Sequence, residues 1–105
     1  MNMNKVKEIR KDKESMHDDY MKEVLDDLIT VYRTKKQSEV IETIKNMLAN
    51  VEIAIEIEKD KGKLISKIED NNSKEKMLFD IKQRRIQMIK EKLIYEKYLK
   101  KESGQ

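Results

Sequence analysis

One histidine and a nearby carboxylate form a pair whose spacing suits a metal ion. Glu14 and His17 stand three residues apart, the spacing by which helical bundles hold di-iron and di-manganese centres. A further ligand would have to come from another segment, for example from Glu42, Glu52 or Glu56. His17 is the only histidine, its neighbours are charged as on a solvated surface, and so short a motif recurs by chance. We therefore predict no metal site.

Other catalytic chemistry lacks its required groups. With five serines, no cysteine and one histidine, nucleophilic catalysis would depend on a single imidazole base, and no glycine-rich turn offers an oxyanion hole. Gly62 and Gly104 are the only glycines, too few for a phosphate-binding loop. We expect no enzymatic activity, no cofactor and no small-molecule substrate.

Basic residues near the C-terminus form the strongest candidate for a binding site. Residues 71–105 hold ten basic and five acidic side chains. Interleaved with Tyr95 and Tyr98, the basic residues would neutralise phosphates of a nucleic acid while the tyrosines contact sugars or bases. The candidate contacts are Lys82, Arg84, Arg85, Lys92, Lys97, Lys100 and Lys101. Because acidic residues interrupt the run, a solvated face paired with the acidic central segment is the preferred interpretation.

Residues 38–58 are the most apolar part of the chain, and the core must gather against them. Their apolar residues recur at steps of three and four, which predicts one broad helical stripe, and Ser38 stands in front as an N-cap. From residue 51 to 57, however, apolar and polar residues alternate, which also fits a hairpin that turns near Gly62 and returns to residue 68. We predict helix, because a lone two-stranded ribbon is marginal in water.

The pattern predicts three helices within one domain, residues 1–105. They span about residues 4–35, 38–70 and 74–101. The first frays at its start, the second is weakened at Gly62, and residues 102–105 form a loose tail. The clearest break is residues 70–73, where Ser73 can cap the last helix.

The last helix carries two adjacent apolar stripes, which implies contact with two neighbours. One stripe contains Leu78, Ile81, Met88, Tyr95 and Leu99, and the other contains Phe79, Ile86, Ile89 and Leu93. The predicted face for a partner or for self-association is Ile44, Leu48, Val51, Ile55, Leu78, Ile81, Met88, Tyr95 and Leu99. We expect an all-α fold, an elongated bundle of the antiparallel hairpin or coiled-coil type, completed by self-association.

Composition supports a helical chain, with 43% charged and 37% hydrophobic residues and no proline. The absence of cysteine fits a reducing cytoplasm, and no apolar run is long enough for a signal peptide or a membrane span. We expect a cytoplasmic protein that acts away from membranes as a non-enzymatic protein–protein interaction module, an adaptor, assembly factor or inhibitor of the kind encoded by phages or mobile elements. The alternative is a nucleic-acid-binding accessory protein that uses the basic last helix.

Overall fold

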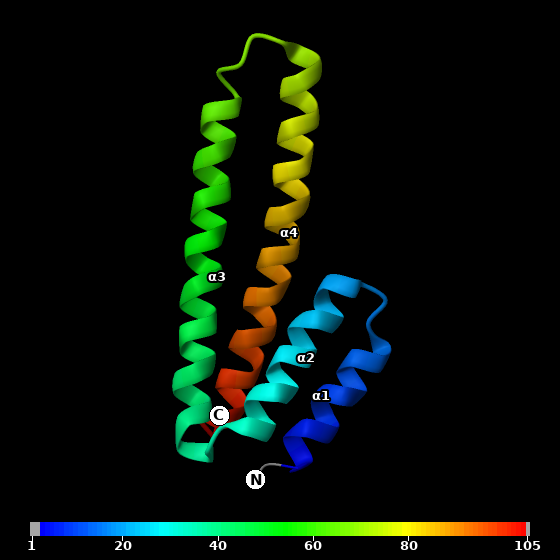
Figure 1. The fold of residues 1–105 in the computed structure, drawn as a ribbon, viewed down its shortest axis with the longest axis vertical. Helices are drawn as coiled ribbons and strands as arrows, with labels where there is room; N and C mark the ends of the chain where they lie inside the picture. Colours follow the sequence, from blue (N-terminus) through cyan, green and yellow to red (C-terminus); the bar gives the residue numbers. More distant parts are fainter. Residues whose placement is uncertain (1–2, 105) are drawn as a thin grey trace.

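The computed structural model describes residues 3–104, which form four helices joined by short connections (Figure 1). The helices are α1 (Met3–Ser15), α2 (Asp19–Thr34), α3 (Gln37–Ile65) and α4 (Asn71–Glu102). α3 and α4 form a long antiparallel hairpin, and α1 and α2 form a shorter hairpin beside one end of it. The molecule measures 55 × 26 × 23 Å. The prediction of an all-α, elongated bundle is confirmed, with four helices where about three were expected.

The predicted helix 4–35 is in fact two helices, because Asp18 starts a new one. Its carboxylate accepts a hydrogen bond from the amide of Tyr20 at 3.0 Å, and its carbonyl accepts one from the amide of Lys22. Such capping satisfies amides that have no partner inside the helix. α1 therefore ends at Ser15, and the chain reverses so that α1 and α2 lie side by side (Figure 1).

Two further helix starts differ from the prediction. α3 begins at Gln37 without a side-chain cap, so Ser38 lies in the first turn. α4 begins directly after Asp70, whose carboxylate accepts a hydrogen bond from the amide of Asn72 at 3.2 Å. Ser73 donates its hydroxyl to the same carboxylate at 2.9 Å and does not itself occupy the cap position. In both cases the cap lies before the serine that the sequence suggested.

The alternating segment from residue 51 to 57 is helical, which confirms the preferred interpretation over the hairpin. Along α3, Val51 and Glu58 are buried while Ile53 and Ile57 are exposed. Because a helix turns by about 100° per residue, Val51 and Glu58 lie on one side of α3 and Ile53 and Ile57 on another. The alternation in the sequence is therefore compatible with a helix that buries one of its sides. Gly62 lies inside α3 without breaking it.

The core lies where the short hairpin meets the long one. The most deeply buried large side chains come from all four helices and are Val6, Ile9, Met21, Leu25, Leu28, Tyr32, Ile44 and Tyr98. The rings of Tyr32 and Tyr98 meet edge to face with their centroids 6.4 Å apart, a favourable aromatic geometry. Beyond this core, the tip of the α3–α4 hairpin projects past the end of the short hairpin (Figure 1).

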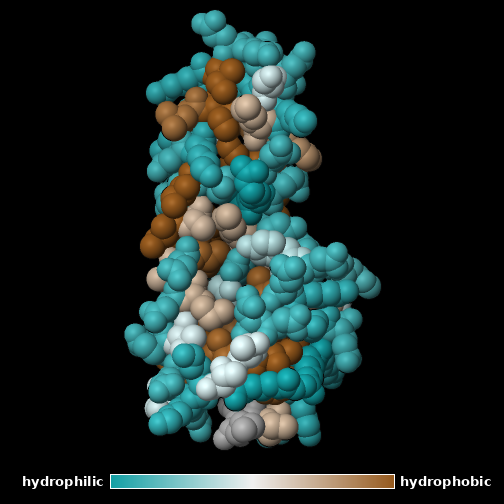
Figure 2. Space-filling model, in the orientation of Figure 1, coloured by the Kyte–Doolittle hydropathy of each residue, from teal (hydrophilic) through white to brown (hydrophobic). Residues whose placement is uncertain are grey.

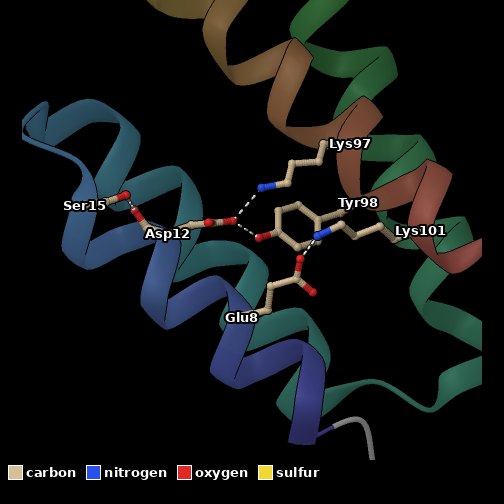
Figure 3. A network of polar contacts seen from close by, with 6 residues as sticks. All are labelled: Glu8, Asp12, Ser15, Lys97, Tyr98 and Lys101. Atoms are coloured by element: carbon tan, nitrogen blue, oxygen red, sulfur yellow. Dashed lines mark hydrogen bonds and ion pairs between the residues drawn. The ribbon is translucent and has the colours of Figure 1, made fainter.

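A polar network fastens α1 to the C-terminal end of α4 (Figure 3). The Asp12 carboxylate accepts hydrogen bonds from the Lys97 ammonium group at 2.7 Å and from the Tyr98 hydroxyl, and Glu8 pairs with Lys101. Both ammonium groups also lie 5.3 Å from the centroid of the Tyr98 ring, within range of a cation–π interaction. Burial alone would raise the pKa of Asp12, but the hydrogen bonds from Lys97 and Tyr98 outweigh it and lower the pKa.

Replacing Asp12 by Asn should weaken this attachment at neutral pH. Because the pKa of Asp12 is lowered on folding, its charge stabilises the folded protein above the ordinary carboxyl value of 3.8, and this stabilisation is lost as the pH falls through the folded-state pKa. We expect Asp12→Asn to lower the free energy of unfolding by about 1–2 kcal/mol at pH 7 and by less on acidification. Urea melts at pH 7 and pH 3 test this, with the exposed Asp60→Asn as control. An equal loss at both pH values would contradict it.

A second prediction concerns Gly62, which occupies a helix interior where Ala is favoured. A Cβ atom at this position would lie 3.9 Å from Cγ2 of Ile81, an ordinary van der Waals contact. We expect Gly62→Ala to raise the free energy of unfolding by about 0.5–1 kcal/mol, the usual difference between the two residues in a helix. Thermal melts measure the change. A destabilised variant would mean that α3 and α4 pack too closely here to accept a methyl group.

Candidate interaction surface

Large apolar side chains are exposed chiefly on the long hairpin. Figure 2 shows apolar atoms at the surface of its projecting part, beyond the short hairpin. On α3 and the connection after it, the exposed residues are Ile53, Ile57, Leu64 and Ile68, and on α4 they are Met77, Phe79, Ile86, Ile89 and Leu93. Grouped exposed residues of this kind mark interaction sites more often than single ones do.

Four of these residues form one line along α4, which we call the exposed stripe: Phe79, Ile86, Ile89 and Leu93. Their exposed fractions are 60, 37, 42 and 58%. Positions 86 and 93 follow the core-facing Ile81 and Met88 by five residues, which places them on the side of α4 away from α3. The exposed stripe spans 14 residue steps, or about 21 Å of helix.

An apolar hollow of about 470 Å³ lies at the lower end of the exposed stripe, where the α1–α2 connection meets α4. It is lined by Ser15, Met16, His17, Asp18, Met21, Lys90, Leu93 and Ile94. Leu93 belongs to both features, so the hollow continues the exposed stripe toward the short hairpin. Methionine side chains adapt to ligands of different shape, and Met16 and Met21 give the hollow this property.

The nine residues predicted as a partner face lie mainly inside the molecule. Ile44, Val51, Ile81 and Tyr95 are buried, and Leu48, Ile55, Leu78, Met88 and Leu99 are half-buried. They follow the sides of α3 and α4 that face each other. The surface left open is the other stripe on the last helix, which sequence reasoning described without assigning it to a site. The sequence signal that could have identified this surface was the presence of two apolar stripes on one helix that has too few neighbouring helices to cover both.

Four of the seven predicted nucleic-acid contacts are engaged in ion pairs within the chain. Their closest nitrogen–oxygen contacts are Arg84 with Glu58 at 3.1 Å, Lys92 with Glu52 at 3.8 Å, Lys97 with Asp12 at 2.7 Å, and Lys101 with Glu8. Pairing with the acidic central segment therefore holds for Arg84 and Lys92, whereas Lys97 and Lys101 pair with α1. Lys82, Arg85 and Lys100 form no ion pair with any residue of 3–104.

A buried carboxylate lies between α3 and α4. Glu58 is 6% exposed and accepts hydrogen bonds from Arg84 at 3.1 Å and from Lys61 at 3.5 Å. The hydrogen bond from Arg84 lowers the pKa of Glu58 despite its burial. The neighbouring Arg85 is half-buried, and its Nε atom is buried without a hydrogen-bond acceptor in the described part of the chain.

A second polar cluster joins α2 to α4 beside a hollow of about 320 Å³. Glu91 accepts hydrogen bonds from the hydroxyls of Tyr20 and Tyr95, each at 2.5 Å. Burial, followed by the bond to Glu91, raises the pKa of both tyrosines, which keeps them protonated as donors. Burial, followed by the charge of Glu91, also raises the pKa of Asp27 in the same hollow. Because each oxygen of Glu91 accepts one of these hydrogen bonds, the cluster links α2 to α4.

The possible metal ligands do not come together. Glu14 lies in the last turn of α1, whereas His17 is exposed in the connection that follows α1. Within residues 3–104, no three His, Cys, Asp or Glu side chains gather as a metal site would require. Glu42, Glu52 and Glu56 are exposed along α3.

No helix in the described range is sufficiently long and apolar to cross a membrane.

Comparison with known proteins adds no relationship. No family model matches the chain, and neither the curated proteins nor the solved structures include a significant match.

Proposed function

We propose that the protein is a small, non-enzymatic protein–protein interaction module that binds another polypeptide through the exposed stripe of α4. The observation that carries this proposal is the line Phe79, Ile86, Ile89 and Leu93, which is exposed although the opposite side of the same helix forms the core. Burial of these side chains in a complex would remove their apolar surface from water, which favours association. An adaptor, an assembly factor and an inhibitor all work by such binding.

The length of α4 and its packing on α3 support the same role. The helix is 32 residues long and packs along α3, so the exposed stripe is already in a fixed geometry before a partner arrives. A preformed surface avoids part of the ordering cost that flexible segments incur on binding. A partner helix packed against such a face would use the same contacts as helices within a bundle.

Nucleic-acid binding is the second candidate, supported by cations of α4 such as Lys82, Arg85 and Lys100, which form no ion pair within residues 3–104. Binding through phosphates would weaken steeply as salt rises, since it depends on the release of counterions. Apolar packing on the exposed stripe would change little over the same range. The ion pairs formed by Arg84, Lys92, Lys97 and Lys101 leave fewer cations for phosphates, so we place this candidate second.

We expect the double change Ile89→Ser and Leu93→Ser to abolish partner binding without unfolding the protein. Both side chains are exposed, so the free energy of unfolding should change by less than about 0.5 kcal/mol per position. The measurement is recovery of proteins from lysates of the native host on immobilised parent and variant, followed by direct binding of the purified partner.

Ile53→Ser with Ile57→Ser is the matched control, because these exposed residues lie on α3. The control should bind the partner as the parent does. Equal recovery of the partner on all three proteins would contradict the proposal. Recovery of nucleic acid that is lost between low and high salt, with no dependence on Ile89 and Leu93, would favour the second candidate.

A further inference from the structure

We infer that the partner presents an acidic amphipathic helix, whose apolar side packs on the exposed stripe and whose carboxylates meet Lys82, Arg85 and Lys90. This inference rests on the proposed function and names the chemistry of the partner. It follows from the charges that border the exposed stripe, from an unsatisfied group on Arg85, and from the shape of the surface.

The charged residues that border the exposed stripe between its two ends are basic. Lys82 stands within it, three residues after Phe79 and four before Ile86, while Arg85 lies on one side of it and Lys90 on the other. Lys82 and Arg85 have no ion pair within residues 3–104, and the contact from Lys90 to Asp18 is long, at 3.8 Å. A partner with carboxylates at the matching positions would be attracted and oriented by these cations.

Glu75 and Glu96 continue the spacing of the exposed stripe just beyond its two ends, whereas the acidic residues between residues 79 and 93 lie elsewhere on the helix. Glu91 points to α2, where Tyr20 and Tyr95 donate to it. Asp80 shares its side of α4 with Gln87, which lines a hollow beside Tyr20. Between residues 79 and 93, carboxylates of α4 therefore do not neutralise the borders of the exposed stripe.

Arg85 gives an independent indication of a missing acceptor. Its Nε atom is buried and forms no hydrogen bond within residues 3–104. A buried donor without an acceptor costs free energy, and a carboxylate is the acceptor that a guanidinium group binds most strongly. Glu58, a buried carboxylate of α3, is already bonded to Arg84 and Lys61. A carboxylate on the arriving helix would bind the two outer nitrogens of the same guanidinium group, which has no ion pair within residues 3–104.

The shape of the surface suits a single helix of about four turns. The exposed stripe is straight and about 21 Å long, which corresponds to about 14 residues of a partner helix. Its lower end opens into the hollow of about 470 Å³ beside Met16 and Met21. A large apolar side chain at one end of the partner helix would fill this hollow and fix its register.

A second copy of this chain is a poorer occupant. If two exposed stripes met, Lys82, Arg85 and Lys90 would face their own counterparts, and like charges oppose association. The exposed residues of α3 have a border of mixed charge, since Lys61 and Lys63 lie among Glu52, Glu56 and Asp60. The inferred partner is therefore a different polypeptide.

The test uses two synthetic peptides of 18 residues with identical leucine positions on one helical side, flanked by Glu in one peptide and by Lys in the other. Fluorescence anisotropy measures the binding of each to the full chain. We expect the Glu peptide to bind at least about tenfold more tightly than the Lys peptide, since a few surface ion pairs supply this much. Ile89→Ser with Leu93→Ser should abolish binding of both peptides.

Charge reversal provides the decisive comparison. Lys82→Glu with Arg85→Glu and Lys90→Glu should invert the preference, so that the Lys peptide binds more tightly. The matched control, Lys35→Glu with Lys36→Glu and Lys45→Glu, changes the net charge equally at exposed positions away from the exposed stripe and should keep the preference of the parent. Circular dichroism checks that both variants remain helical.

Equal binding of the two peptides, or no binding of either, would overturn the inference. Sedimentation that shows a dimer dependent on Ile89, or binding of phosphatidylserine vesicles in place of the Glu peptide, would overturn it as well. If a native partner depends on Ile89 and Leu93 but not on the three reversed charges, only the inference on its acidity fails. If binding of the native partner does not depend on Ile89 and Leu93, the proposed function fails together with the inference.

Discussion

The packing of α3 against α4 is the interaction on which the other features depend. These helices contain 29 and 32 residues, whereas α1 and α2 contain 13 and 16. The short hairpin can therefore cover only part of the long one, and the tip of the long hairpin must be stable on its own contacts. Those contacts include the buried Glu58 with Arg84 and the buried Ile81. A side chain exposed there is exposed because α1 and α2 are too short to reach it.

This constraint explains how one helix can serve folding and recognition together. Ile81 and Tyr95 turn inward and are buried, while Ile86 and Leu93 turn outward. The inward side needs precise neighbours, since cores are densely packed. The outward side needs only a straight, apolar line with the right charges beside it. Substitutions on the two sides should accordingly affect different properties, stability for one and binding for the other.

Local patterns in the sequence predicted much of this structure, and interactions between distant residues account for the rest. Apolar spacing was sufficient to identify helices and both stripes of α4. It did not reveal the break at Asp18, because capping depends on one side chain and leaves the apolar pattern almost unchanged. It also could not assign Lys97 to Asp12, 85 positions away, or show which stripe faces inward. Such assignments depend on how helices are arranged in space, which spacing along the chain does not encode.

The network of Asp12 and Tyr98 has a further consequence for how the molecule can be joined to others. It holds the first helix against the last turns of α4, so α1 starts and α4 ends at the same end of the molecule (Figure 1). The tip of the long hairpin lies at the opposite end of a body 55 Å long. A fluorescent label, a solid support or a fused domain attached at either terminus would therefore sit at the base and leave the tip free to approach a target.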